Sequence, residues 1–126
     1  MDVKLSRKLA EGFMVAFRLL LIVLLLSVVI YTVPVVMNHG LNLFVVFFGD
    51  IMEMGWPGQF NLDFMGFLVL SGVWLMWRNE FSPGGVVLGV FGFFGGIPLL
   101  TTYLLILSFQ CDDMKEIMLG KNRATA

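Results

Sequence analysis

The sequence predicts an all-α membrane protein, with three transmembrane helices and an interfacial amphipathic helix between the first and the second. Hydrophobic residues make up 59% of the 126 residues and charged residues only 13%, and the mean hydropathy is +0.92. A soluble domain of this size has too much surface to bury so much apolar side chain. Three apolar runs are also long enough to cross a hydrocarbon core of roughly 30 Å.

Composition also bounds the function. The net charge of -1 argues against a nucleic-acid partner, because phosphate binding needs a basic face. Cys111 is the only cysteine, so the chain forms no internal disulfide and has no metal cluster of the usual cysteine spacing. We predict a single membrane domain over residues 1–126, with no metal and no cofactor.

The first span is predicted at about residues 13–37. Leu19 to Met37 carries no charge, and Arg18 lies in the first turns, from where its side chain can reach back to the headgroups. A basic start followed by an apolar run also resembles a secretory signal, but the stretch after Ile30 lacks the small residues of a cleavage site. We therefore expect an uncleaved anchor.

The next stretch, about residues 41–54, is too short an apolar run to cross a bilayer, and Asp50 and Glu53 interrupt it. Helical spacing gives it two unlike faces, which predicts an amphipathic helix lying along the membrane surface. The apolar face comprises Leu41, Phe44, Val45, Phe48, Ile51 and Met52, and the other face Asn42, Val46, Gly49, Asp50 and Glu53. We interpret Trp56 and Pro57, which follow, as an interfacial anchor and a turn.

The second span is predicted at about residues 60–78 and the third at about 84–109. Trp74, Trp77 and Arg78 form an aromatic and basic belt at the end of the second span. Ser82 is placed to cap a third helix whose first residue is Pro83.

The polar tail, residues 110–126, has three apolar residues that fit one or two short amphipathic turns: Met114, Ile117 and Met118. Gly120 could close those turns. The acids Asp112, Asp113 and Glu116 could hold a cation, but such a run is usually a solvated face.

Basic residues predict the orientation. Lys4, Arg7, Lys8 and Arg18 precede the first span, which places the N-terminus in the cytoplasm, in a multi-pass protein of a bacterial inner membrane. Three spans then put the C-terminus outside, against the positive-inside rule, because the tail carries Lys115, Lys121 and Arg123. A fourth crossing through residues 41–54 would remove this conflict but would bury two acids, so we predict three spans.

Asp63 is the acid nearest to membrane depth. We predict that it lies in the first turn of the second helix, near the outer interface, where the helix dipole favours a carboxylate and Asn61 could serve as the cap. The alternative is a partly desolvated acid that binds a proton, a cation or a headgroup. His39 is the only histidine and lies in a predicted turn. Asp63, Asn61 and His39 are the candidate ligand-binding residues.

Glycine marks one face of the third span. Gly85, Gly89, Gly92 and Gly96 repeat at intervals of four, three and four residues. This glycine row contains two small-xxx-small units, which permit another helix to approach backbone to backbone. Gly96 also lies beside Gly95 and two residues before Pro98, so we predict a kink in the middle of the span.

Three stretches carry a resemblance: "HGLNLFVVFFGDIMEM", "FNLDFMGFLVLSGVWLMWR" and the glycine-rich third span. Over residues 37–109 the chain resembles a group of small bacterial three-helix integral membrane proteins of uncharacterised function. In that group a His-Gly or Asn-Gly turn and a Phe-containing segment precede an Asp near the start of the second span. The resemblance implies the same layout of helices, and the long polar tail departs from it.

The sequence contains no Ser-His-Asp order, HExxH, Walker loop or paired intramembrane carboxylates, so we expect no catalytic activity. Two classes of function fit. The first is an accessory or assembly subunit whose partners are the lipid bilayer and other membrane helices, either copies of itself or a larger complex. The second is an oligomeric small transporter or lipid-binding protein that uses Asp63 and a cavity beside the kink.

Overall fold

The computed structural model describes residues 2–125, and in this range the chain forms six helices and no strand. α1 runs from Val3 to His39. It therefore begins about ten residues before the predicted start. Asp2 caps it by accepting from the Lys4 N–H (3.2 Å). Residues 3–11 contain no proline or glycine that would stop this basic segment from being helical. Pro34 lies inside α1, and Gly40, with φ 76°, ends it.

α2 runs from Leu43 to Met52 and α3 from Trp56 to Arg78. The helix begins four residues before the predicted start of the second span. Gly55 is the extended residue that precedes α3, and Pro57 lies in the first turn, where a missing N–H costs nothing. The Trp-Pro pair therefore opens the helix and is not a turn outside it.

α4 runs from Pro83 to Gln110 and is broken at Gly96, whose φ of 61° and ψ of -146° are not helical. The predicted cap is confirmed, since the Ser82 hydroxyl accepts from the Gly85 N–H (3.1 Å). The predicted kink is also confirmed. Glycine has no Cβ and can adopt this conformation at little cost, so the break falls at Gly96. It divides α4 into a first half (residues 83–95) and a second half (residues 97–110).

The tail folds into two short helices, α5 (Met114–Leu119) and α6 (Lys121–Ala124). Asp113 caps α5 by accepting from the Glu116 N–H (2.9 Å), and Gly120, with φ 86°, ends it, as predicted. Ile117 is fully buried. The tail is therefore an ordered part of the fold.

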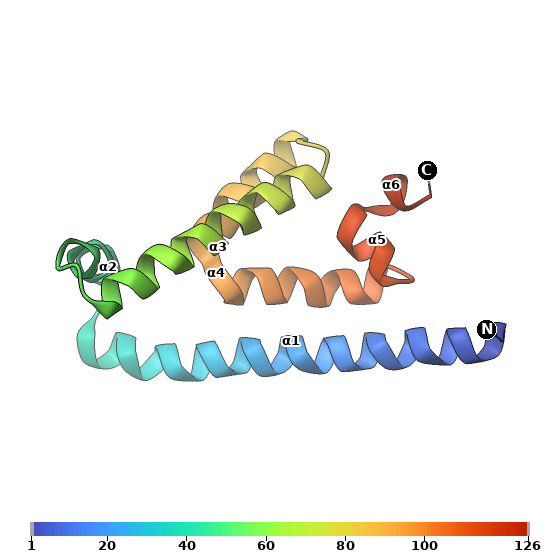
Figure 1. The fold of residues 1–126 in the computed structure, drawn as a ribbon, viewed down its shortest axis with the longest axis horizontal. Coiled ribbons are helices and arrows are strands. Elements are labelled where there is room, and N and C mark those ends of the chain that lie inside the picture. The colour runs from blue at the N-terminus through green and yellow to red at the C-terminus, as the bar shows by residue number, and fades with distance from the viewer. Residues whose placement is uncertain (1, 126) are drawn as a thin grey trace.

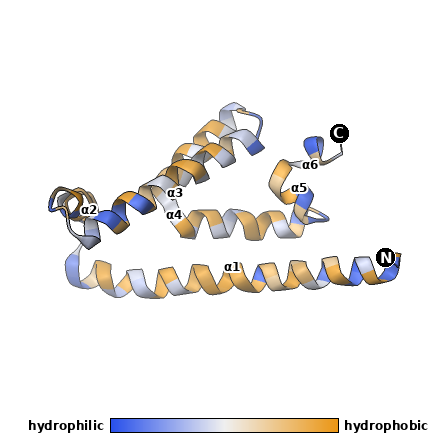
Figure 2. Cartoon of the chain, in the orientation of Figure 1, coloured by the Kyte–Doolittle hydropathy of each residue, from blue (hydrophilic) through white to orange (hydrophobic). Residues whose placement is uncertain are grey.

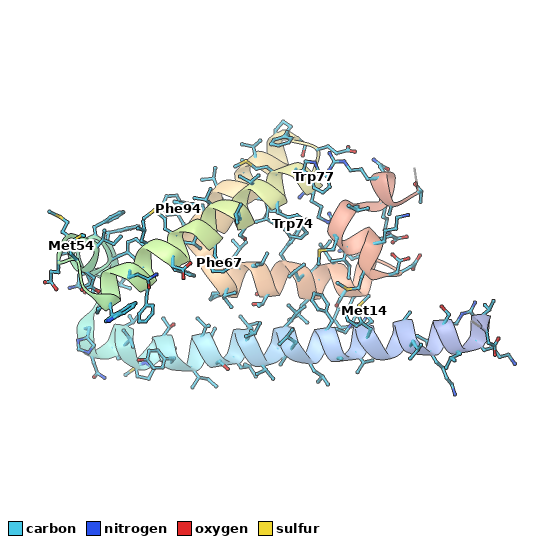
Figure 3. All side chains as sticks on the ribbon, viewed as in Figure 1. Met14, Met54, Phe67, Trp74, Trp77 and Phe94 are labelled. Atoms are coloured by element: carbon cyan, nitrogen blue, oxygen red, sulfur yellow. The ribbon has the colours of Figure 1, made fainter. Side chains whose placement is uncertain are left out.

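The helices are arranged around α4 (Figure 1). α3 and the first half of α4 form an antiparallel hairpin, and the second half of α4 lies along α1. α2 crosses the beginning of α3 and is seen nearly end-on in Figure 1. A small core joins α1, the second half of α4 and α5; its buried members are Met14, Leu21, Leu104, Leu107, Cys111 and Ile117. Met14 points from α1 into this contact (Figure 3).

α1, α3 and α4 are each long and apolar enough to cross a membrane. Polar residues gather at the N-terminal end of α1, around α2 and the start of α3, and in α5 and α6, whereas most of the long helices is hydrophobic (Figure 2). Large apolar side chains cover the outside of α1 and α3. This distribution is that of a protein embedded in lipid.

Three of the four residues of the glycine row, Gly85, Gly89 and Gly92, are buried. A Cβ at Gly89 would lie 2.8 Å from the carbonyl oxygen of Gly72 in α3, and a Cβ at Gly72 would lie 2.9 Å from the Gly89 oxygen. A Cβ at Gly92 would collide with the fully buried Leu75. The first half of α4 thus approaches α3 within the same chain at a distance that only glycine permits.

Leucine at Gly89 should force α3 and α4 apart, because the obstacle is backbone and cannot rotate away. We expect Gly89→Leu to lower the free energy of unfolding by about 1–3 kcal/mol or more, measured as a lower thermal midpoint in detergent. Gly66→Leu is the matched control, because a Cβ at Gly66 meets nothing within 4 Å. Val87→Leu, at a half-exposed site, should also be tolerated. Equal tolerance at all three positions would contradict this contact.

Candidate functional site

Asp63 is the eighth residue of α3, about 10 Å along the helix from its start. The predicted position in the first turn was wrong, because α3 begins at Trp56. The side chain is exposed on the outside of the helix. The dipole effect decays within the first turn, so a helix-start signal no longer accounts for this acid.

Asn61 does not cap α3, contrary to the prediction. Its Nδ2 donates to the carbonyl oxygen of Phe47 in α2 (3.1 Å) and makes a longer contact with Asp50 Oδ2 (3.5 Å). One turn earlier, Gly58 is buried, and a Cβ there would collide with the Asp50 carbonyl oxygen. Asn61 and Gly58 therefore fasten α2 across the beginning of α3, which is a structural role that the sequence did not reveal.

His39 is the last residue of α1 and is exposed. It lies on a shallow depression along the outer end of α1, together with Ser27, Tyr31, Pro34 and Asn38. The structure does not bring His39 together with Asp63 or Asn61 in one site. The three candidate ligand-binding residues thus remain separate, and their binding roles stay predictions.

An apolar cavity of about 520 Å³ lies between α3 and the second half of α4, beside the break at Gly96. Its volume is in the range of small-molecule sites. Phe67 and Trp74 point into this region from α3 (Figure 3), and Leu100 and Met118 line the other side. Asp63 is not among the lining residues. The cavity suits a hydrocarbon chain better than an ion or a polar solute.

Arg78 is the most extensively bonded polar side chain in residues 2–125. Its Nε donates to the carbonyl oxygen of Ile117 (2.6 Å), and Nη2 donates to that of Glu116 (3.2 Å). Its Nη1 donates to the Tyr103 hydroxyl (3.1 Å), and Nη2 contacts Cys111 Sγ (3.9 Å). Arg78 thereby ties the end of α3 to both α4 and α5.

Two further contacts reinforce this attachment. The indole N–H of Trp74 donates to the Met118 carbonyl oxygen (3.1 Å), and Arg123 donates to that of Trp77 while its guanidinium lies 4.2 Å from the Trp77 ring centroid. The predicted belt of aromatic and basic residues is therefore also a clamp that holds the tail. We call Trp74, Trp77 and Arg78 the tail clamp.

Arg18 makes the corresponding contact from α1. Its Nε donates to the Ser108 hydroxyl (3.1 Å) and its Nη2 to the Ser108 carbonyl oxygen (2.5 Å). The guanidinium also lies 4.2 Å from the ring centroid of Phe109. We predicted that the Arg18 side chain can reach the headgroups. In the structure it is hydrogen-bonded to the end of α4.

The acids of the tail serve local structure. Glu116 Oε2 accepts from the Asp112 backbone N–H (3.0 Å), and Asp113 caps α5. Among residues 2–125, no group of three or more His, Cys, Asp or Glu side chains could hold a metal ion.

Comparison with models of known protein families, with curated proteins and with solved structures finds no match.

Replacing Arg78 should release the tail. Arg78→Gln removes a charged donor to two carbonyls of α5, and each hydrogen bond to a charged group is worth roughly 1.5–3 kcal/mol. We expect faster amide hydrogen exchange over residues 114–119 and faster tryptic cleavage at Lys115 and Lys121. Arg7→Gln, at an exposed site in α1, is the control. Unchanged exchange in Arg78→Gln would show that the packing of Ile117 and the contacts of Trp74 and Arg123 hold the tail without Arg78.

Proposed function

We propose that the protein is a non-catalytic accessory or assembly subunit that acts by helix packing in a membrane. The membrane of this proposal is a bacterial inner membrane, with the N-terminus in the cytoplasm. The observation that supports this most directly is the uncovered outer part of α1. Of its 37 residues only Met14 and Leu21 are buried, and both lie in the half that faces α4. No residue of α1 beyond Leu21 is buried, and only Leu25 and Val28 are half-buried in residues 22–30, so the side of the helix turned away from α4 offers a free surface to another helix.

One face of this free surface carries the chemistry of a membrane helix interface. Ser27, Tyr31, Pro34 and Asn38 follow one another at intervals of four, three and four residues, and all lie on the same shallow depression. We call these four residues the α1 stripe. By helical geometry the stripe points about 120° away from the face that bears Met14 and Leu21. The Tyr31 hydroxyl and the Asn38 amide can hydrogen-bond to a partner helix in lipid. The Ser27 hydroxyl donates to the Val23 carbonyl oxygen (2.6 Å) and can still accept from a partner.

The glycine row packs against α3 within this chain, and this packing bears on where a partner helix can bind. Because α3 already occupies Gly89 and Gly92, those glycines assemble this chain and leave no room for a second helix. A partner helix is therefore better placed on α1. The same argument applies whether the partner is another copy of the chain or a larger complex.

A second candidate is lipid binding, which the apolar cavity beside Gly96 favours. The sequence predicts that a lipid-binding protein would use Asp63 together with a cavity beside the kink. The two are separate in the structure, so binding of a hydrocarbon chain would rest on Leu68, Trp74 and Leu100 without the acid.

The accessory function can be tested by photo-crosslinking in cells. We expect a photo-reactive phenylalanine at Ser27 or Tyr31 to form a crosslink to a partner helix, because both positions lie on the α1 stripe. Val33 is the control: it is half-exposed and about 120° further round the helix. Products would be identified by mass spectrometry after purification in mild detergent. Crosslinks that are equally abundant at Val33, or absent at the stripe, would argue against docking there.

Lipid binding can be tested by filling the cavity. Leu100→Trp should reduce the lipid that remains bound in native mass spectrometry, because the larger ring occupies the space beside Gly96. Val73→Trp is the control, since Val73 is exposed on α3 and does not line the cavity. Asp63→Asn should leave the retained lipid unchanged. A loss in Asp63→Asn equal to that in Leu100→Trp would restore the link between the acid and the cavity.

A further inference from the structure

We propose that α4 is a re-entrant hairpin: it enters the membrane and leaves it on the same side, with Gly96 at its tip, so that the chain crosses the bilayer twice. This inference is independent of the proposed function. It differs from the three-span layout expected from the sequence, for which α4 is also long and apolar enough.

The first argument is that both ends of α4 meet the end of α3. Asn79, four residues before the start of α4, donates to the Tyr103 hydroxyl in the second half of α4 (3.1 Å). Arg78 contacts the same hydroxyl, and also Cys111, the residue that follows α4. A straight helix of 28 residues would separate its ends by about 42 Å. The chain has therefore turned back on itself.

The second argument is the length of the two halves. Residues 83–95 and 97–110 would each extend only about 20 Å as a helix, and the hydrocarbon core is roughly 30 Å thick. Neither half crosses the core alone. Figure 1 shows the first half running toward α1 and the second half running back along it.

The third argument fixes the depth of the tip. Arg18 holds Ser108 beside the first residues of the uncharged stretch of α1, which begins at Leu19. Gly96 lies twelve residues before Ser108, about 18 Å further along α1. That distance reaches the middle of the core and stops short of the opposite surface.

The chemistry of the tip suits this depth. A broken helix leaves backbone groups without their usual partners, which is expensive in lipid. Pro98 follows the break and has no N–H to leave unpaired. The Thr101 hydroxyl donates to the Ile97 carbonyl oxygen (2.7 Å), and the Thr102 hydroxyl donates to that of Pro98 (2.6 Å). Both hydroxyls are thus paired within the second half of α4, so neither leaves a polar group exposed to lipid near the break.

The consequence is a consistent charge distribution. With two crossings, α1 and α3, both termini lie on one side, and so do all eight Lys and Arg residues: Lys4, Arg7, Lys8, Arg18, Arg78, Lys115, Lys121 and Arg123. The positive-inside rule places that side in the cytoplasm. The conflict between the basic tail and a three-span topology disappears, and Asp50 and Glu53 need not be buried.

The topology can be tested with single cysteines in a Cys111→Ser background, labelled by a membrane-impermeant maleimide in vesicles of known orientation. We expect cysteines at positions 4, 80 and 121 to react from one side and a cysteine at position 53 from the other. Labelling of position 121 from the same side as position 53 would overturn the proposal.

A second measurement leaves Cys111 and its contact with Arg78 intact. An epitope fused behind the tail of the otherwise unchanged chain should be digested by protease in inside-out vesicles and protected in right-side-out ones. The opposite pattern would place the tail outside and refute the hairpin, whatever the behaviour of the cysteine variants.

Discussion

The attachment of the tail to Arg78 is the constraint on which the path of the chain depends. A guanidinium has five N–H donors in a planar fork, and this one uses them on α4 and α5 together. Because Arg78 ends α3 and the tail follows α4, their contact closes a loop that contains the whole of α4. α4 must then bend, and Gly96 is the residue that lets it.

Glycines make the bend in α4 compatible with close packing in two ways. Gly72 and Gly89 bring the backbones of α3 and the first half of α4 together, which secures the hairpin by van der Waals contact when lipid is as apolar as leucine. Gly96 serves conformation instead, since a side chain there would be strained at its positive φ. Beyond Gly96 the second half of α4 diverges from α3 toward α1, and the apolar cavity lies in the space that this divergence opens.

Local signals in the sequence predicted local structure well. Ser82 before Pro83, the glycine and proline around residue 96, and Gly120 after α5 each mark a boundary or a break that the structure confirms. The start of α3 was misplaced because Trp-Pro was interpreted as a turn, although proline is equally suited to a first helical turn. The partners of Arg18, Asn61 and Arg78 lie between 11 and 90 residues away, and neither periodicity nor composition specifies contacts at that separation. A hint was available in the tail, where Met114, Ile117 and Met118 are apolar residues at helical spacing in a largely polar segment.

The hydrogen bonds of Arg18 and Arg78 also limit which side chains remain available to bind a ligand or a partner. A side chain that is already bonded inside the chain has little left for a ligand, and the two arginines nearest the membrane, Arg18 and Arg78, are both engaged in this way. Asp63 remains exposed and lines neither the cavity nor the depression that includes His39. An exposed carboxylate on a helix that faces lipid is costly, and a partner that covers it would lower that cost. The uncovered outer part of α1 needs no such compensation, because its side chains suit lipid and a partner helix alike. A partner helix that supplied a hydrogen-bond donor to Asp63 would lower that cost, whichever surface of the chain it packed against.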